Sequence, residues 1–398
     1  MIIPRRTHIF VLVDALGWTY IRDREFLSDL LPYRQPLHTV LGFSSGAIPT
    51  ILTGVSPAQH GHWNLFYFDP ERSPFRFTRP LSWLPEKLVN RRVIRKLLKE
   101  TGRRLLGLGR GFECVVSPRV LSWFNFVETR NIYEPGGISG APSIFDQLVK
   151  NNVEYRSYCY HRYSDQEILK QTARDLKESK CGFFFLYLSE LDAFLHDHCQ
   201  DSAAVSERIA WYGRELRSLY ELAEQVDPEV TFTVFSDHGM TPVHHHFDLV
   251  ERVESLGLKM PSDYLRVYDS TMARFWFFND QARQKVTDCL SQITCGKIIS
   301  EEVRRAWGVN FPDDRFGEVV FLLDPGWLLA HSDFHGKRWM PVGMHGYHPD
   351  DEYSDAAYLG NCPPPSQMCT IADIFQAMEK AASDAGRELP AVVGRSAS

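Results

Sequence analysis

Short, almost entirely apolar segments alternate with longer amphipathic segments along much of this chain. Four apolar segments have the length and composition of strands: residues 8–14, 153–160, 182–189 and 230–236. Between the later ones, two segments show the apolar spacing of helices: residues 165–179 and 203–226. Strands without polar alternation are covered on both faces, and strands that alternate with helices run parallel. The pattern therefore predicts an α/β fold with a mostly parallel central sheet and helices on both faces.

Two long segments interrupt this alternation. Residues 64–135 are first aromatic and then strongly basic, whereas residues 245–340 mix strand-like and helical stretches punctuated by Gly and Pro. A chain of 398 residues is long enough for a large core with insertions. We therefore expect an α/β core made of residues 1–63, 136–244 and 341–398. Residues 64–135 form an aromatic and basic insertion, and residues 245–340 form a second insertion or cap.

Composition excludes several classes of protein. The formal net charge of −6 gives no overall field that attracts nucleic acid, and no apolar run approaches the length of a membrane span. The first apolar run ends at Asp14 after only five residues, so we expect no secretory signal. The eight cysteines are scattered and form no CxxC pair. We therefore expect no disulfide scaffold and a cytoplasmic location.

Acidic residues follow three of the predicted strands, at Asp14, Asp192 and Asp237. In a parallel sheet the carboxyl ends of the strands meet at one edge, where functional groups gather. Carboxylates and imidazoles are the donors that divalent metal ions prefer. Candidate imidazoles accompany them: His196 lies four residues after Asp192, and His238 is adjacent to Asp237. Each pair also has a purely structural interpretation: Asp192 and His196 as neighbours on one face of a helix, and Asp237 and His238 as polar side chains in a turn after a strand.

His345 is a further candidate ligand. It lies between Gly343 and Gly346, and glycine allows the backbone to approach a site closely. Glycine is equally common in ordinary turns, so the spacing leaves both interpretations open.

Ser44, Ser45 and Gly46 stand where a strand-like run gives way to a short helical pattern that ends at Thr53 and Gly54. A serine at a helix N-terminus is commonly an N-cap. The same position also suits a nucleophile, because free N–H groups and the helix dipole attract an anion. We expect Ser44 to be the nucleophile, with Ser45 as the alternative if the turn shifts by one residue.

The basic stretch 87–110 carries nine Lys and Arg against Glu100 alone, with leucines and Ile94 at roughly helical spacing. A solvated amphipathic cap helix explains this pattern. Attraction of an anionic substrate, or contact with a lipid surface or nucleic acid, explains it as well.

Taken together, these motifs resemble the alkaline phosphatase superfamily, in particular its type I phosphodiesterase/nucleotide pyrophosphatase branch. Residues 236–240, SDHGM, match the motif of that branch in full. Ser44 lies nine residues before the threonine of a Thr-Gly pair, as the family nucleophile does. The resemblance covers residues 8–70, 182–240 and 343–347 and leaves both insertions unmatched. Its remaining matches, in family order, are Asp14, His60-Gly61, Asn64, Tyr67 to Pro70, Asp192 with His196, and His345-Gly346-Tyr347.

The resemblance implies a hydrolase with two divalent metal ions, usually zinc, with manganese as an alternative. One ion would be held by Asp192, His196 and His345, and the other by Asp14, Asp237 and His238. Ser44 would lie against both ions and form a phosphoseryl intermediate during in-line displacement at phosphorus. The backbone N–H of Ser45 and the side chain of Asn64 are the expected substrate-binding groups.

The sequence departs from the branch in ways that bear on the substrate. The branch has threonine followed by Phe-Pro-Asn, whereas this chain has Ser44, Ser45, Gly46 and Ala47. Gly46 and Ile48 also occupy the positions where a formylglycine sulfatase needs Pro and Arg. We expect cleavage of a phosphodiester or pyrophosphate in a small substrate. The alternatives are a phosphomonoesterase, a phosphonate hydrolase, a phosphotransferase, or a non-catalytic protein that docks on membranes or nucleic acid.

Overall fold

The computed structural model describes residues 6–108, 112–178, 181–335 and 339–386. Its largest element is a six-stranded sheet in the order β2-β16-β7-β1-β6-β5. Strands β5, β6, β1 and β7 run parallel, β16 is antiparallel to β7, and β2 is antiparallel to β16. This architecture confirms the predicted fold class. The strands are β1 (His8–Val13), β2 (Tyr33–Leu37), β5 (Tyr155–Tyr158), β6 (Phe183–Leu188), β7 (Thr231–Phe235) and β16 (Ala356–Gly360).

The four predicted strands are β1, β5, β6 and β7, and the two edge-side strands β2 and β16 were not predicted. All six residues of β1 and all six of β6 are buried, as strands covered on both faces must be. By contrast β2 contains Pro36 and is only partly buried, which suits a sheet edge that needs few ladder bonds. Its sequence carries no apolar alternation that would reveal a strand.

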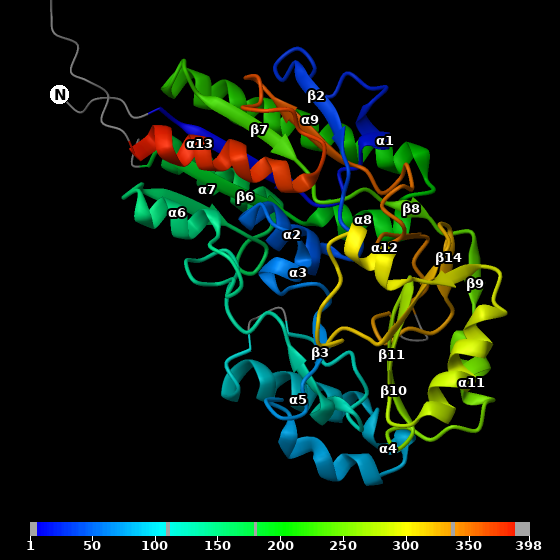
Figure 1. Ribbon diagram of the computed structural model, residues 1–398. Coiled ribbons are helices and arrows are strands. Elements are labelled where there is room, and N and C mark those ends of the chain that lie inside the picture. The colour runs from blue at the N-terminus through cyan, green and yellow to red at the C-terminus, as the bar shows by residue number, and fades with distance from the viewer. Residues whose placement is uncertain (1–5, 109–111, 179–180, 336–338, 387–398) are drawn as a thin grey trace, which may run out of the picture.

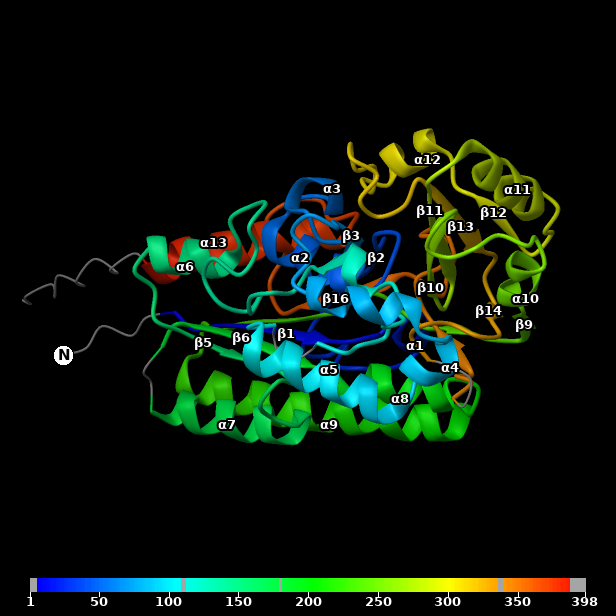
Figure 2. The ribbon, with the colours of Figure 1, turned by 90° about the horizontal axis from the view of Figure 1, so that it is seen from below.

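Helices cover both faces of the sheet (Figure 2). Alternate residues of β1 explain why: Ile9, Val11 and Val13 join one apolar core, while Phe10 and Leu12 join the other. The first core packs under α7 (Asp165–Lys177), α8 (Glu190–His198) and α9 (Ser202–Val226). The second packs under α2 (Ser44–Thr53), α6 (Ile144–Lys150) and α13 (Ile374–Gly386). Short helices α1 (Trp18–Ile21) and α3 (Pro57–His60) complete this part of the chain.

The first predicted insertion is bracketed by β3 (Phe66–Phe68) and β4 (Phe124–Phe126), which pair antiparallel. Its own core is aromatic, with the rings of Phe66, Phe75, Phe112 and Phe126 in mutual contact. Between β3 and β4 lie the 3-10 helix Arg76–Trp83, α4 (Glu86–Val89), α5 (Arg92–Leu105) and the 3-10 helix Leu121–Trp123. In Figure 1, α4 and α5 lie at the edge of the molecule away from the central sheet.

The second predicted insertion forms a separate four-stranded sheet in the order β10-β11-β13-β12. Arg274, fully buried in β11, donates to the carboxylate of Asp269 and to the backbone oxygen of Phe66, so it ties this sheet to the first insertion. The predicted domain boundaries themselves stay a prediction. The elements are β10 (Tyr264–Asp269), β11 (Met272–Phe277), β12 (Gly296–Ile298), β13 (Val319–Leu323), α10 (Leu249–Glu254), α11 (Asp280–Ser291) and α12 (Glu301–Ala306).

Two small strand pairs lie beside these sheets: β9 (His245–Phe247) with β14 (Trp327–Leu329), and β8 (Thr241–Pro242) with β15 (Gly343–Met344). A final 3-10 turn, Ile371–Asp373, precedes α13. Among the helices that the structure describes, none combines the length and the apolar character that a membrane span requires.

Candidate active site

The three predicted acids lie at one edge of the central sheet. Asp14 directly follows β1, Asp192 lies in the first turn of α8 just after β6, and Asp237 follows β7. The register sets the ends of these strands side by side, because Val13 pairs with Leu188 and Leu12 with Phe235. The expectation that the carboxyl ends of the strands gather the functional groups therefore holds here.

Asp192, His196 and His345 form the first group of potential metal donors. Their donor atoms all lie within 4.8 Å of one another. Asp192 and His196 share one face of α8, and Oδ2 of Asp192 lies 3.4 Å from Nε2 of His196, while its Oδ1 lies 3.5 Å from Nε2 of His345. Nδ1 of His196 donates to the backbone oxygen of Gly343 at 2.8 Å, which leaves Nε2 free to bind an ion.

Asp14, Asp237 and His238 form the second group, with the same 4.8 Å limit. Nε2 of His238 lies 3.5 Å from a carboxylate oxygen of Asp14 and 3.2 Å from one of Asp237. Nδ1 of His238 donates to the backbone oxygen of Gly239 at 2.9 Å, so its Nε2 again faces the acids. The hydroxyl of Tyr187 donates to Asp14 and fixes the orientation of that carboxylate.

The two groups adjoin each other through the imidazoles of His238 and His345. Their rings are stacked with centroids 3.8 Å apart. Gly346 makes the position of His345 possible: its φ is +87°, and a Cβ there would lie 2.7 Å from the ring of Phe43. All six residues predicted as metal ligands are therefore brought together in two adjacent sets of three.

In the metal-free protein the pKa shifts keep Asp192 and His345 in the form that binds metal. The raised pKa values of Asp14 and of His196, which lies beside Asp192, instead favour a proton that an ion would displace. Burial, and then the nearby charges of Asp237 and Asp192, raise the pKa of Asp14 well above its usual range. Burial alone would raise the pKa of Asp192, but the positive charge of His196 holds it well below that range. Burial, and then the charge of His238, lower the pKa of His345 far below 6.5, so this imidazole is neutral. Neutral imidazole and ionised carboxylate are the forms that bind metal.

Orphaned donor atoms provide a further test of whether divalent ions fit this site. Oδ1 of Asp14, Oδ1 of Asp192, Oδ2 of Asp237 and Nδ1 of His345 are buried without a hydrogen-bond partner. Burying several such atoms together is costly unless a cation is present. Three carboxylates and three imidazoles are also a donor set that suits zinc or manganese. The residues present therefore fit divalent metal ions.

Ser44 is the first residue of α2 and faces the second group. Its Oγ lies 2.9 Å from Nε2 of His238. The alternative that Ser44 is a helix cap is wrong, because Phe43 occupies the N-cap position and the Ser44 hydroxyl contacts His238 instead. Ser45 differs, since its hydroxyl donates to the backbone oxygen of Trp63 at 2.7 Å. In the described part of the chain, the backbone N–H groups of Ser44 and Ser45 donate to no other backbone group.

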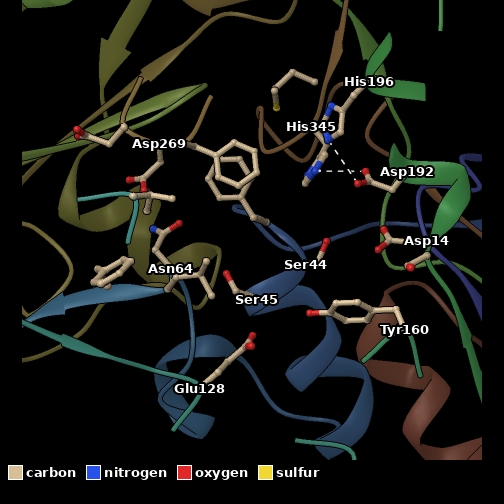
Figure 3. A pocket seen from close by; sticks show the side chains of 18 of the residues that line it. Asp14, Ser44, Ser45, Asn64, Glu128, Tyr160, Asp192, His196, Asp269 and His345 are labelled. Atoms are coloured by element: carbon tan, nitrogen blue, oxygen red, sulfur yellow. Dashed lines mark ion pairs between the residues drawn. The ribbon is translucent and has the colours of Figure 1, made fainter. Parts of the chain in front are cut away.

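These groups open into a cavity of about 400 Å³. Figure 3 shows Ser44 and Ser45 at the start of α2, with Asp14, Asp192, His196 and His345 on one side of them. Asn64, predicted to bind substrate, lines the same cavity from the first insertion. Asp237 and His238 are not among the described residues that line the cavity. Its apolar side chains are Phe43, Leu65, Phe66, Val115, Phe334 and Met344.

The cavity residues that were not predicted as site residues include Glu128, Tyr160, Asp269 and Asp333. Glu128 lies two residues beyond β4, and Asp269 ends β10. Tyr160 belongs to a segment predicted as a strand, but β5 ends before it. Each reaches the cavity only through packing between distant segments, and none stands in a motif that would single it out.

The parallel sheet, the nucleophile position at a helix N-terminus and the paired sets of metal donors define an alkaline phosphatase-like hydrolase. Residues 8–348 match the family model for type I phosphodiesterase/nucleotide pyrophosphatase, and the chain belongs to this family. It is therefore a hydrolase acting on phosphoester bonds, in a family whose members depend on metal ions. A comparison with curated protein sequences finds no match to the chain.

Solved structures with a similar fold come from animals and bacteria. Human ectonucleotide pyrophosphatase/phosphodiesterase 5 superposes with a TM-score of 0.66 at 14% identity, covering 95% of this chain and 94% of that one. An inactive variant of the murine protein in complex with AMP gives 0.66 at 16% identity, with 95% of each chain covered. Phosphonoacetate hydrolase from Sinorhizobium meliloti 1021, in complex with phosphonoacetate, gives 0.62 at 15% identity, with 95% and 96% covered. At these identities the likeness shows the fold.

Proposed function

We propose that the protein is a metal-dependent phosphodiesterase in which Ser44 is the nucleophile. The observation that carries this proposal is the position of the Ser44 hydroxyl, 2.9 Å from His238 and at the start of α2. Ser45 is the weaker candidate because its hydroxyl is engaged by the backbone of Trp63. We propose zinc as the ion, with manganese as the alternative, on the strength of the mixed carboxylate and imidazole donors.

The side chains suit an in-line displacement. Asp192, His196 and His345 would hold one ion, and Asp14, Asp237 and His238 the other. Bound there, the ions would supply positive charge that lowers the pKa of a serine hydroxyl and neutralises charge on phosphate oxygens. Ser44 Oγ, having lost its proton to solvent, forms a bond to phosphorus as the bond to the leaving alcohol breaks. Water then cleaves the phosphoseryl ester and restores Ser44. The backbone N–H of Ser45 and Nδ2 of Asn64 would orient the phosphate, since Ser45 N–H donates to no other backbone group and Asn64 lines the same cavity.

The charge of the cavity favours a diester over a monoester or a pyrophosphate. Among the described residues that line it, none is a lysine or an arginine. A diester carries one negative charge, whereas a monoester dianion or a pyrophosphate brings further charge that no side chain here would neutralise. We therefore propose diester cleavage, with pyrophosphate cleavage as the alternative.

Two chromogenic substrates test this preference. With metal-loaded protein, we expect kcat/KM for bis-p-nitrophenyl phosphate to exceed that for p-nitrophenyl phosphate by about tenfold or more, equivalent to about 1.4 kcal/mol. An equal or reversed ratio would favour a phosphomonoesterase. Absence of hydrolysis of both esters, with metal bound, would contradict the phosphoesterase proposal as a whole.

The stretch 87–110 is a separate proposal, with Gly109 and Arg110 outside the described residues. On α5, Val93 and Leu97 share one face and are 78% and 65% exposed, beside the exposed Arg92 and Lys96. Trp83, which precedes α4, is 88% exposed. Nucleic acid requires no such apolar surface, whereas an anionic lipid surface accepts both kinds of side chain. We therefore propose that this face binds anionic membranes.

Sedimentation with vesicles tests the membrane proposal. We expect binding to vesicles containing phosphatidylglycerol and little binding to pure phosphatidylcholine. The double substitution Val93→Ser with Leu97→Ser, on an exposed face, is expected to weaken that binding about tenfold or more. Binding that persists unchanged in this variant, or dimerisation through the same face, would contradict the proposal.

A cytoplasmic location is also proposed. All eight cysteines are free, which suits a reducing compartment.

A further inference from the structure

Glu128 places a carboxylate in the cavity that no other side chain neutralises. Val127 donates its backbone N–H to Leu65 at 2.9 Å, which holds the loop after β4 against the cavity wall. Figure 3 shows Glu128 and Tyr160 pointing into the same cavity as Ser44 and Ser45. In the part of the chain that the structure describes, no hydrogen bond or ion pair engages the Glu128 carboxylate. Burial raises the pKa of Glu128 to about 7, so the side chain lacks compensating charge.

The other acids of the cavity wall are already paired. Asp269 forms an ion pair with Arg274, with Nε of the arginine 2.6 Å from Oδ2 of the acid. Asp333 forms one with Arg266, whose guanidinium nitrogen lies 3.2 Å from its Oδ2. Outside the two groups of metal donors, Glu128 is therefore the one unpaired carboxylate among the described residues that line the cavity. The Glu128 carboxylate is therefore available to form an ion pair with a positively charged group of a ligand.

A second acceptor faces the same space. Asn64 is 1% exposed, and its Oδ1 has no hydrogen-bond partner, while Nδ2 contacts only the sulfur of Met272 at 3.7 Å. A buried carbonyl oxygen left without a donor costs free energy until a ligand supplies one. The rings of Phe66 and Tyr160 also line the cavity, and aromatic rings attract cations.

Two unpaired acceptors and two aromatic rings line the cavity, and none of its described lining residues is a lysine or an arginine. These features suit an ammonium group. We propose that Glu128 and Asn64 bind a protonated amine on the organic group of the phosphodiester, so that the enzyme selects phosphate esters of amino alcohols. The inference rests on the proposed phosphodiesterase function and goes further by naming the substrate class. The same residues exclude a second phosphate, because Glu128 would repel it.

A matched pair of diesters tests this inference. Aminoethyl p-nitrophenyl phosphate and propyl p-nitrophenyl phosphate have nearly the same shape and differ by one positive charge. With metal-loaded protein we expect kcat/KM to favour the aminoethyl ester by about tenfold or more. In Glu128→Gln, which keeps the shape and removes the charge, we expect the ratio to fall to about one. In the control Glu134→Gln, an equal loss of charge at an exposed position outside the cavity, the ratio is expected to stay unchanged.

Binding provides a second readout that needs no turnover. We expect calorimetric titration of metal-loaded Ser44→Ala protein to show tighter binding of aminoethyl phosphate than of propyl phosphate, and Glu128→Gln to remove the difference. Equal binding and equal hydrolysis of the two esters, or a preference that survives Glu128→Gln, would overturn the inference and leave the phosphodiesterase function standing. Discrimination in binding without hydrolysis of either ester would support the ammonium site and overturn the proposed function instead.

Discussion

Ser44→Ala is expected to lower kcat on bis-p-nitrophenyl phosphate by about a thousandfold or more while the protein stays folded. The reason is that the substitution removes the one hydroxyl at the start of α2 that lies against His238. Small residues follow it on α2, and its side chain is only partly buried, so little packing is lost. Steady-state kinetics with equal metal loading, together with thermal denaturation, measure both effects.

Ser45→Ala is the matched control. It removes a hydrogen bond to the backbone oxygen of Trp63 and is expected to cost about 1 kcal/mol of stability. We expect kcat to stay within about tenfold of the wild-type value, because this hydroxyl does not face the metal donors. The reverse result, with Ser45→Ala inactive and Ser44→Ala active, would assign the nucleophile to Ser45.

Asp14→Asn is expected to have two effects of opposite sign. Activity should fall by about a thousandfold, because a neutral amide replaces a carboxylate that would hold an ion. In the metal-free protein the same change should stabilise the fold, because Asp14 is buried beside Asp237 and Asp192 and their charges raise its pKa. Tyr187 can still donate to the amide oxygen, so the hydrogen bond is kept.

The raised pKa of Asp14 also determines how the stability of the metal-free protein depends on pH. Because the folded-state pKa of Asp14 is raised, the unfolded chain releases this proton first as pH rises. The free energy of unfolding therefore falls as pH rises above the unfolded-state pKa, by about 1.4 kcal/mol for each unit of pKa difference, until the folded-state pKa is passed. Denaturation of chelator-treated protein across pH should show this slope in the wild type and a smaller slope in Asp14→Asn. Equal slopes would contradict the assigned environment of Asp14.

The metal donors were predictable because local sequence and sheet topology agree. Asp14 and Asp237 each follow a buried strand, and neighbouring parallel strands bring their carboxyl ends together. His196 lies one helical turn after Asp192, so a single helix orients both. The pairing of His345 with this group depended on the family resemblance, since its own segment gives only a glycine-flanked turn.

The cavity wall was not predictable for a physical reason. Glu128 and Asp269 come from different insertions. They line one cavity because segments such as β3, β4 and β11 pack together, with Arg274 of β11 donating to the backbone oxygen of Phe66 in β3. No local periodicity encodes such packing. The same holds for β16, whose five small and apolar residues form a strand only by pairing between β2 and β7.

The central claim is that the two groups of donors hold two ions beside Ser44, and native mass spectrometry tests it most directly. We expect two divalent ions for each wild-type chain. We expect one ion in Asp192→Asn and one in Asp237→Asn, because each substitution weakens one group and leaves the other intact. A wild-type chain that binds one ion or none at saturating metal, or either variant retaining two ions at wild-type affinity, would contradict the two-ion site.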